Sequence, residues 1–566
     1  MENIFIQLAV ILGLSSSLGY LVYRLKLPLL IAYLLAGLFL SAILSFDITN
    51  SLILSFLPNI GIAFVLFLVG MELDLREIRS FGKQVLIAGI LQIIITSVFG
   101  TFIAQSFNLG LTEAIYLGIG LSFSSTIVVV KLLSDKKDLT SLHGKLSLGI
   151  LLLEDLLAVL ILLAMTSSTS LLGLNFSQSL PLAMFVVKVF GLFSLALLLS
   201  HFILPAIFRS VSDSGELLFL TALAWCFAFI TLAEAMGFSI LIGAFLAGVA
   251  LASSPYHFQI QGKVKPLRDF FTTLFFVYLG TRVNFDDILT NFPLILTFAL
   301  YAMVVKPLIF LLILGMFGFR RHTMFHTAIN LSQISEFSLI ILLVGLELGV
   351  ASQSVLTVIA LSTIFSIVGS SVMISKSRSI YKLVSSYISF FERRRHVLEE
   401  DSKKELKDHV ILLGAHQVGE RIIMFLKREK IPFLVLDFNP HQVEVLSKGG
   451  VPVIFGDMSD PEVLDILNLS KARLIVSTVP DLLDNKLLIE DLNNLNISSP
   501  VIVRGENLKE AKSLYKAGAD FVYIPDVVSG EFLVEIFKDH LNDRDYFKSR
   551  PKIELERLSR KTLAWE

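Results

Sequence analysis

Two adjacent carboxylates, Glu154 and Asp155, interrupt a long hydrophobic run. A charged side chain at bilayer depth costs roughly 3 kcal/mol or more, so membrane proteins retain one mainly where it handles ions or protons. No basic residue lies between Lys145 and Lys188. The pair therefore predicts a cation or proton site inside a membrane, with a structural ion pair that fixes helix register as the alternative.

Helix geometry separates the two carboxylates. Neighbouring residues point about 100° apart, because one turn takes about 3.6 residues. We expect one carboxylate to face an ion path and the other to turn toward a different helix. Lys306 is the best partner for the second, since a paired buried lysine can stay charged whereas a lone one tends to lose its proton. A cation that competes with a proton for one carboxylate would give antiport.

The composition predicts a membrane part followed by a soluble tail. Hydrophobic residues make up 54% of the 566 positions, and charge becomes dense only after about residue 375. The expected boundaries are 1–378 for a transmembrane domain, 379–408 for a linker, 409–541 for a Rossmann-like domain and 542–566 for a terminal tail. A net charge of −1 offers no basic field for nucleic acid. The single cysteine, Cys226, excludes a disulfide framework.

Thirteen segments are candidates for membrane spans, since a span needs about 20 apolar residues. Lys and Arg concentrate in the connections that follow odd-numbered spans, whereas the opposite set holds essentially Arg282 alone. Cytoplasmic loops carry the positive excess, so we expect the N-terminus outside and the tail in the cytoplasm, in a bacterial inner membrane. The segments are 3–23, 28–45, 52–72, 84–105, 111–133, 145–166, 181–203, 214–234, 236–253, 267–281, 290–316, 324–346 and 353–375.

Polar residues interrupt the fifth and twelfth of these spans near the middle. Unwound backbone at that depth persists only where it lines a cavity, and two such spans in matching positions are typical of inverted repeats. The alternative is that these side chains bond their own helix or join neighbouring helices. We favour a substrate site at these two interruptions. Its candidate residues are Ser124, Ser125 and Thr126 in the fifth span and Ser332, Gln333 and Glu336 in the twelfth.

The sequence of the tail predicts a doubly wound α/β domain of six strands. Strands are expected at 410–413, up to 437, and at 451–455, 474–479, 500–504 and 521–524, each followed by a helical pattern.

The first turn of this domain is an incomplete dinucleotide fingerprint. Gly414 and Gly419 fit the G-x-G-x-x-G rule, but His416 stands where the middle glycine lets the backbone approach a pyrophosphate. Asp437 is placed to bond a ribose, and Asp457 follows the third strand. These residues predict an adenosine nucleotide, either AMP or NAD(H), with the imidazole favouring a mononucleotide.

Taken together, the chain resembles the Kef-type monovalent cation:proton antiporters of the cation:proton antiporter-2 family over nearly its whole length. The tail resembles the TrkA-N/RCK nucleotide-binding domains. The membrane motifs that carry the resemblance are 66–74 (LFLVGMELD), 124–126 (SST), 154–155 (ED), 245–249 (FLAGV), Lys306 and 332–337 (SQISEF).

The resemblance implies a sodium-proton-antiporter fold, a homodimer and movement of a core domain against a dimer domain. It makes Asp155 the ion-binding carboxylate and pairs Lys306 with Glu154. Potassium-efflux members usually have Gln where this chain has Glu154, so K+ and Na+ both stay open, with K+ favoured. The tail would gate transport by binding a regulatory ligand, without catalytic cofactor or metal.

Two other classes remain as alternatives. A ligand-gated K+ efflux channel needs a TVGYG-like filter, and the sequence contains none. A membrane-tethered oxidoreductase needs redox residues near the nucleotide, and the sequence offers no clear set. We therefore expect a secondary antiporter rather than an enzyme.

Overall fold

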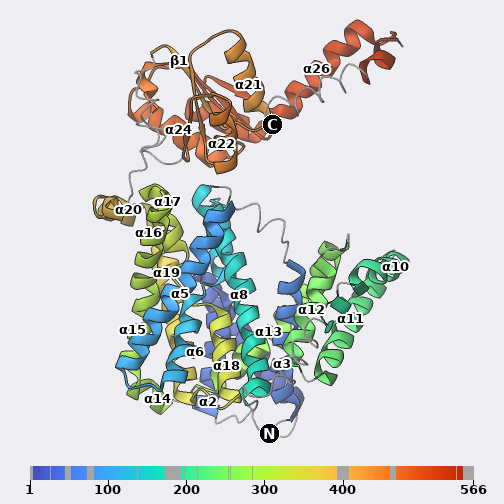
Figure 1. Cartoon of the computed structure of the whole chain (residues 1–566), viewed down its shortest axis with the longest axis vertical. Coiled ribbons are helices and arrows are strands. Elements are labelled where there is room, and N and C mark those ends of the chain that lie inside the picture. Colours follow the sequence, from blue (N-terminus) through green and yellow to red (C-terminus); the bar gives the residue numbers. More distant parts are fainter. Residues whose placement is uncertain are drawn as a thin grey trace. The chain divides into compact units, whose positions relative to one another are not determined.

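The computed structural model divides the chain into two compact units (Figure 1). One comprises Met1–Lys136 with His143–Glu392, and the other Lys137–Leu142 with Arg393–Glu566. The described residues are 4–25, 27–44, 52–72, 82–136, 138–139, 141–172, 191–192, 194–196, 198–212, 214–236, 238–252, 254, 256–283, 285–391, 407–458, 467–543 and 545–551.

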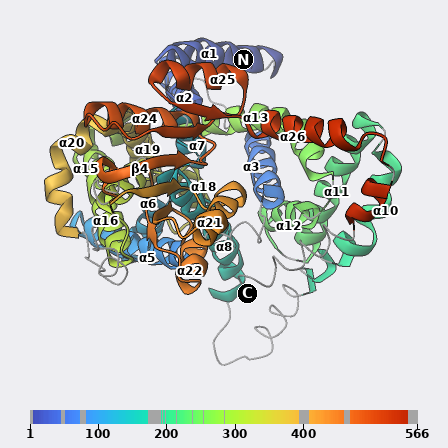
Figure 2. The same ribbon diagram turned by 90° about the horizontal axis from the view of Figure 1, so that it is seen from above.

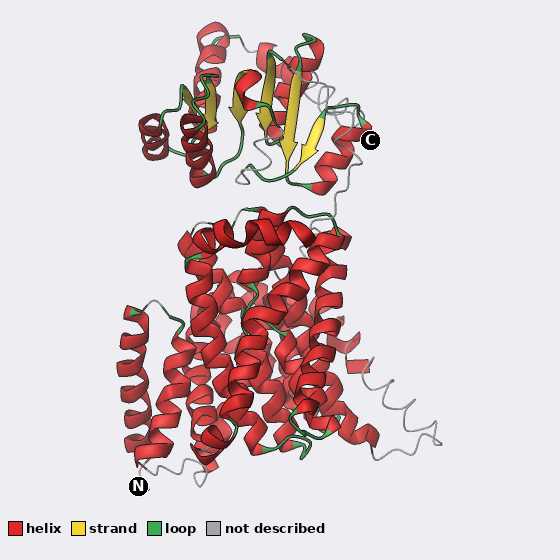
Figure 3. Ribbon diagram, turned by 90° about the vertical axis from the view of Figure 1, so that its left-hand side faces the viewer, coloured by secondary structure: helices red, strands yellow, loops and turns green. Residues whose placement is uncertain are grey.

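The first unit is helical throughout its described parts (Figure 3). Its elements are α1 (Ile4–Arg24), α2 (Leu29–Leu44), α3 (Leu52–Glu72), α5 (Gly82–Ser106), α6 (Leu111–Ser122), α7 (Thr126–Lys136), α8 (Leu142–Leu172), α10 (Leu204–Val211), α11 (Gly215–Ala235), α12 (Ile240–Ala252), α13 (His257–Thr281), α14 (Phe285–Thr290), α15 (Phe292–Leu300), the π-helical turn η2 (Tyr301–Val305), α16 (Lys306–Met316), α17 (Arg321–Asn330), α18 (Glu336–Glu347), α19 (Gln353–Ser375), α20 (Ser377–Ile388) and the 3₁₀ turn η3 (Ser389–Phe391).

Six helical segments in the described residues are long and apolar enough to cross a membrane, or up to seven if one bent pair counts as a span. The predicted number of thirteen is therefore not confirmed. Three further predicted spans correspond to shorter apolar helices at Leu29–Ser41, Ile60–Met71 and Ile240–Ala252. The predicted span 181–203 lies largely outside the described residues.

The surface of α5 fits a lipid environment. Five large apolar side chains on this helix are 45–67% exposed and recur at three- or four-residue spacing, which places them on one face. A contiguous apolar strip of this kind marks a membrane or protein contact. The five are Ile87, Ile90, Ile94, Val98 and Phe102.

Most helix contacts in the first unit fall within two groups. One contains α1, α2, α3, α11, α12 and α13. The other contains α5, α6 and α15–α19. The α8 helix belongs to this group as well, because its Leu153 packs against Gly89 of α5, 2.6 Å from where a Cβ on that glycine would lie. Figure 2 shows α11 and α12 on the side of this unit opposite α15 and α16.

Close helix packing explains two of the sequence motifs. Gly70 of 66–74 faces Gly248 of 245–249: a Cβ on Gly70 would lie 2.4 Å from the carbonyl oxygen of Phe245, and one on Gly248 would lie 2.1 Å from that of Phe67. Only glycine lets α3 and α12 approach this closely, as small residues do at membrane helix interfaces. These motifs therefore build the first helix group.

The second unit contains a parallel six-stranded sheet in the order β3-β2-β1-β4-β5-β6, visible in Figure 3. This order confirms the predicted doubly wound fold, which reverses its winding between β1 and β4. Apolar clusters cover both faces of the sheet. The elements are β1 (His409–Leu413), α21 (Gln417–Arg428), β2 (Phe433–Asp437), α22 (Pro440–Lys448), β3 (Val453–Phe455), η4 (Leu469–Lys471), β4 (Ala472–Ser477), α24 (Leu482–Asn494), β5 (Val501–Arg504), α25 (Leu508–Ala517), β6 (Phe521–Tyr523) and α26 (Pro525–His540).

Candidate ion-binding site

Both predicted helix interruptions are present in the structure. The first separates the end of α6 at Ser122 from the start of α7 at Thr126. The second separates the end of α17 at Asn330 from the start of α18 at Glu336. Backbone groups at such ends lose their helical partners and need others. Polar side chains of the two stretches and of the helices around them supply these partners.

The two interruptions are hydrogen-bonded to each other. The Ser124 hydroxyl donates to the Leu331 carbonyl oxygen at 3.1 Å, and the Gln333 amide donates to the Ser125 carbonyl oxygen at 3.5 Å. The Ser125 hydroxyl donates to the Glu336 carboxylate at 2.8 Å. The broken helices therefore meet, as the matching polar clusters predicted.

Glu154 and Asp155 have different surroundings. Glu154 is fully buried, and its carboxylate accepts the Ser124 backbone N–H at 2.6 Å and the Ser124 hydroxyl at 3.4 Å. Asp155 is half-buried and accepts the Thr126 hydroxyl at 2.9 Å. The helical geometry thus turns the neighbours toward different residues of the first interruption, as the 3.6-residue repeat predicted.

Lys306 is fully buried beside this pair. Its ammonium group attracts Glu154 electrostatically, but the described residues show no ion pair between the two side chains. The Lys306 Nζ instead donates to the Gln333 carbonyl oxygen at 3.2 Å. This differs from the expected direct pairing because the unwound stretch exposes a carbonyl oxygen that the lysine satisfies. Lys306 therefore balances a charge and holds an unwound backbone together.

A π-helical turn positions Lys306. The backbone N–H of Lys306 donates to the Tyr301 carbonyl oxygen, five residues earlier, and Pro307 follows without an N–H to continue the ladder. Single π turns occur often at functional sites. The Tyr301 hydroxyl also reaches the Thr96 carbonyl oxygen in α5 at 2.8 Å. Pro307 was the only local hint of this turn in the sequence.

The half-helix ends give the site its electrostatic pattern. The N-termini of α7 and α18 meet at Thr126 and Glu336 and carry partial positive charge. The carboxylates of Asp155 and Glu336 lie at these two ends. The C-terminus of α6 carries partial negative charge, and there Gln92 of α5 donates to the Ser122 carbonyl oxygen at 2.8 Å. The oxygen-rich centre suits a cation that exchanges with a proton.

The Gly-rich turn of the second unit keeps its two predicted glycines for steric reasons. Gly414 has a φ of +88°, which favours glycine. A Cβ on Gly419 would lie 2.2 Å from the Gly414 carbonyl oxygen, so glycine permits the approach of α21 to β1. His416, at the third position, is exposed and adopts an extended conformation.

The two predicted aspartates of this domain are buried and bonded to backbone groups. Asp437 accepts the N–H of Ala415 at 2.7 Å and that of Asn439 at 2.8 Å. It therefore ties β2 to the Gly-rich turn. Asp457 accepts the N–H of Leu142, which belongs to the same compact unit, at 2.9 Å. Carboxylate oxygens have further lone pairs, so these bonds leave acceptor capacity for a ribose.

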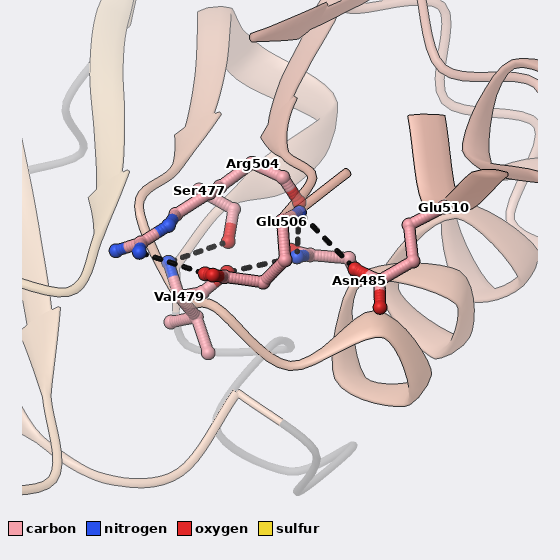
Figure 4. A network of polar contacts seen from close by, with 6 residues as sticks. All are labelled: Ser477, Val479, Asn485, Arg504, Glu506 and Glu510. Atoms are coloured by element: carbon pink, nitrogen blue, oxygen red, sulfur yellow. Dashed lines mark hydrogen bonds and ion pairs between the residues drawn. The ribbon is translucent and has the colours of Figure 1, made fainter. Parts of the chain in front are cut away.

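Sequence reasoning missed a polar network at the ends of β4 and β5 (Figure 4). Asn485 donates to the carbonyl oxygens of Val479 at 2.9 Å and Arg504 at 3.1 Å, and the Arg504 guanidinium pairs with Glu506 at 2.7 Å. Burial raises the pKa of neighbouring Tyr523 to about 12 against the opposing effect of Arg504. The network stiffens the carboxyl edge of the sheet, where open α/β folds bind ligands.

Each of the two units matches a known protein family. Residues 11–376 match the family model described as "Sodium/hydrogen exchanger, transmembrane", and residues 410–525 match "TrkA-N domain". A solved structure of the sodium proton antiporter MjNhaP1 from Methanocaldococcus jannaschii, 17% identical, covers 66% of this chain and 96% of its own, with a TM-score of 0.50. That likeness concerns the fold.

Three curated relatives cover nearly the whole chain. A "Putative K(+) efflux antiporter KefB" of Alkalimonas amylolytica is 26% identical over 94% of this chain and 81% of its own length. A "Putative cation/proton antiporter YbaL" of Escherichia coli is 24% identical over 93% and 96%. A "Glutathione-regulated potassium-efflux system protein KefC" of Enterobacter sp. is 26% identical over 92% and 82%. The chain belongs to the sodium/hydrogen exchanger family, as a Kef-type transporter rather than an enzyme, with a C-terminal TrkA-N domain.

Proposed function

We propose that this transporter exchanges K+, in preference to Na+, for H+ across the bacterial inner membrane. The names of the relatives, which include K+ efflux antiporters, support K+ as the cation. The excess of Lys and Arg in alternate connections supports an external N-terminus and a cytoplasmic tail.

Asp155 is the carrier in this proposal. It is half-buried and accepts a hydrogen bond from Thr126 at the N-terminus of α7, where a bound cation or proton would neutralise it. Glu154 is the supporting neighbour, because it is fully buried and its carboxylate is held by Ser124 and attracted by Lys306. Exchange follows if the site changes sides of the membrane only when Asp155 holds a cation or a proton, and not when Asp155 is an empty anion. The single observation that carries the proposal is the Asp155–Thr126 contact at the meeting of two broken helices.

The tail regulates this exchange by binding an adenosine nucleotide, AMP or NAD(H). The tight turn at Gly414 and Gly419 and the carboxylate of Asp437 beside it support such a ligand. His416 is exposed at the N-terminus of α21, where it meets the phosphate.

The chain acts as a homodimer in this proposal. No described residue of α26 is buried, although the helix is rich in large apolar side chains. Phe532 is 57% exposed and Phe537 46% exposed. Covering such a surface with a second copy removes apolar area from water.

Proton flux in liposomes tests the transport step. The purified full chain is reconstituted with a pH-sensitive dye, and K+ and Na+ are titrated separately for the wild type and Asp155→Asn. We expect the variant to lose exchange with both cations. Glu234→Gln is the control, because it removes an exposed carboxylate near the end of α11, outside both interruptions. Exchange by Asp155→Asn at the wild-type rate would refute the role of Asp155, and cation flux without proton movement would indicate a channel.

Nucleotide binding is measured on the same full chain. AMP and NADH are titrated against the wild type and Asp437→Asn by calorimetry, and proton flux is recorded at saturating nucleotide. We expect binding to weaken in the variant and flux to change on binding in the wild type. If neither nucleotide binds nor alters flux, the regulatory part of the proposal fails while the transport part stands.

A further inference from the structure

Gln333 lies in the unwound stretch between α17 and α18 and is fully buried. The two ends of its side-chain amide are in different situations. The nitrogen donates to the Ser125 carbonyl oxygen at 3.5 Å, whereas the oxygen, Oε1, has no hydrogen-bond partner among the described residues. One strong acceptor is therefore left unused at the meeting of the two broken helices.

This orientation of the amide follows from its neighbour. A carbonyl oxygen such as that of Ser125 can only accept, so the Gln333 nitrogen must face it and the Gln333 oxygen must point away. A buried acceptor without a partner carries a desolvation penalty that nothing repays. Native structures hold few such groups, and each calls for an explanation such as a bound ion or water.

The backbone around Gln333 is held on both sides. The Lys306 ammonium group donates to the Gln333 carbonyl oxygen at 3.2 Å. The next backbone N–H, that of Ile334, donates to the Ser366 hydroxyl in α19 at 3.1 Å. A side chain on a backbone anchored in this way is pre-organised, as binding residues need to be.

The amide bonds the same short stretch that holds the carboxylates of the site. Its partner Ser125 stands between Ser124, which bonds Glu154, and Thr126, which bonds Asp155. We infer that the Gln333 Oε1 is a direct ligand of the transported cation and favours K+ over Na+. This inference rests on the proposed function, because it needs Asp155 to bind the same cation.

The preference follows from the kind of oxygen that Gln333 presents. A carboxylate exerts a strong field that can offset the larger dehydration cost of Na+, whereas a neutral carbonyl oxygen exerts a weaker field that does not. The number and field strength of carbonyl oxygens are among the properties held to separate K+ from Na+ in filters. Adding the Gln333 oxygen beside Asp155 lowers the mean field and favours the larger, less strongly hydrated ion.

Two substitutions test the oxygen itself. Gln333→Met keeps the length of the side chain and removes both polar atoms, and Gln333→Glu replaces the neutral oxygen by a charged one. In the liposome assay we expect Gln333→Met to raise the half-saturating K+ concentration about tenfold, the size of effect that one lost polar contact produces. The Na+ value should change much less. Gln333→Glu should shift the preference toward Na+.

Ser362 provides a control outside the site. It is fully buried in α19, and its hydroxyl donates to the Ile295 carbonyl oxygen in α15 at 3.0 Å. Neither residue belongs to an unwound stretch. We expect Ser362→Ala to lower stability while leaving the ratio of K+ to Na+ affinity unchanged.

The outcomes separate this inference from the proposed function. An unchanged K+ to Na+ ratio in Gln333→Met, or an equal change in Ser362→Ala, overturns the ligand role and leaves a buried water as the partner of Oε1. Exchange by Asp155→Asn would instead refute the proposed function. If Gln333→Met does not fold, Gln333→Asn retains the oxygen on a shorter side chain. Its thermal stabilisation by K+ and by Na+ in detergent should then show a reduced K+ preference, and an unchanged preference overturns the inference.

Discussion

The Ser124 hydroxyl donates to the Leu331 carbonyl oxygen at 3.1 Å and so joins two helix interruptions that lie 207 residues apart. The same residue donates its backbone N–H to Glu154 at 2.6 Å. One serine therefore connects both interruptions and one of the two carboxylates. The site depends on this connection, because neither unwound stretch can satisfy its own backbone groups.

Replacing Ser124 by alanine should loosen the site without removing a charge. The variant leaves the buried Leu331 carbonyl oxygen without its donor, at a cost of about 1–3 kcal/mol, while the backbone bond to Glu154 remains. We expect slower exchange and a lower melting temperature of the purified protein. Ser122→Ala is the control, since that hydroxyl bonds only the Ile119 carbonyl oxygen of its own helix. Equal effects of the two substitutions would contradict the prediction.

Lys306 and Glu154 should be energetically coupled. Lys306→Met leaves the buried Glu154 without its opposing charge and the Gln333 carbonyl oxygen without a donor, so we expect a loss of roughly 3–5 kcal/mol of stability. Combining it with Glu154→Gln removes the unbalanced charge and should restore part of that loss. Chemical unfolding of the two single variants and the double variant measures the coupling. Strict additivity would show that the two side chains act independently.

The second unit should be sensitive to a single methyl group at its Gly-rich turn. Gly419→Ala places a Cβ 2.2 Å from the Gly414 carbonyl oxygen and forces α21 away from β1, at about 1–3 kcal/mol. Gly530 in α26 has no atom within 4 Å of the position of a Cβ, so Gly530→Ala should be tolerated. Hydrogen–deuterium exchange of 409–428 in the full chain reports the difference. Unchanged protection in Gly419→Ala would argue against the close approach.

Acid should destabilise the sheet through His409. Burial lowers the pKa of this imidazole below its usual value of about 6.5, although its hydrogen bond to the Leu467 carbonyl oxygen raises it. The unfolded chain then takes up a proton that the folded chain resists, so stability falls as the pH drops through about 6.5 and is constant above it.

Exchange protection of β1 at pH 7.5 and 5.5, compared with His409→Gln at each pH, isolates this effect. The comparison is needed because burial and Glu490 raise the pKa of Asp491, which stabilises the fold on acidification. The wild type should lose more protection between pH 7.5 and pH 5.5 than the variant does. An identical difference at both values would exclude His409 as the cause.

Local patterns in the sequence predicted the elements that bear the site. The polar clusters at Ser124 and Gln333 predicted both helix interruptions, because such residues are costly in a lipid-exposed helix. The spacing of Glu154 and Asp155 predicted that they face different neighbours. Apolar runs bounded by turn residues predicted all six strands and the doubly wound fold. Each of these inferences used residues close together in the sequence.

Contacts between distant segments were beyond such patterns. The bond of Lys306 to the Gln333 carbonyl oxygen depends on how α16 packs beside an unwound stretch, and nothing near either residue records it. The Arg504–Glu506–Asn485 network likewise depends on the pairing of two strand ends. The predicted number of spans is not confirmed, because several apolar helices in the described residues are shorter than the roughly 20 residues of a uniform span.

The π turn before Lys306 has a consequence for comparing and engineering this part of the chain. A turn closed five residues back holds one residue more than a regular helical turn, so it behaves as an insertion within a continuous helix. Deleting one residue between Tyr301 and Val305 would restore a regular helix and keep the segments before and after it in phase, whereas deleting one from the regular part of α15 would rotate everything before it by about 100° relative to Lys306. An alignment without a gap at this point would therefore match the wrong faces of the helix on one side of the turn. The phase of this helix, rather than the identity of its residues, decides which side chains accompany the lysine.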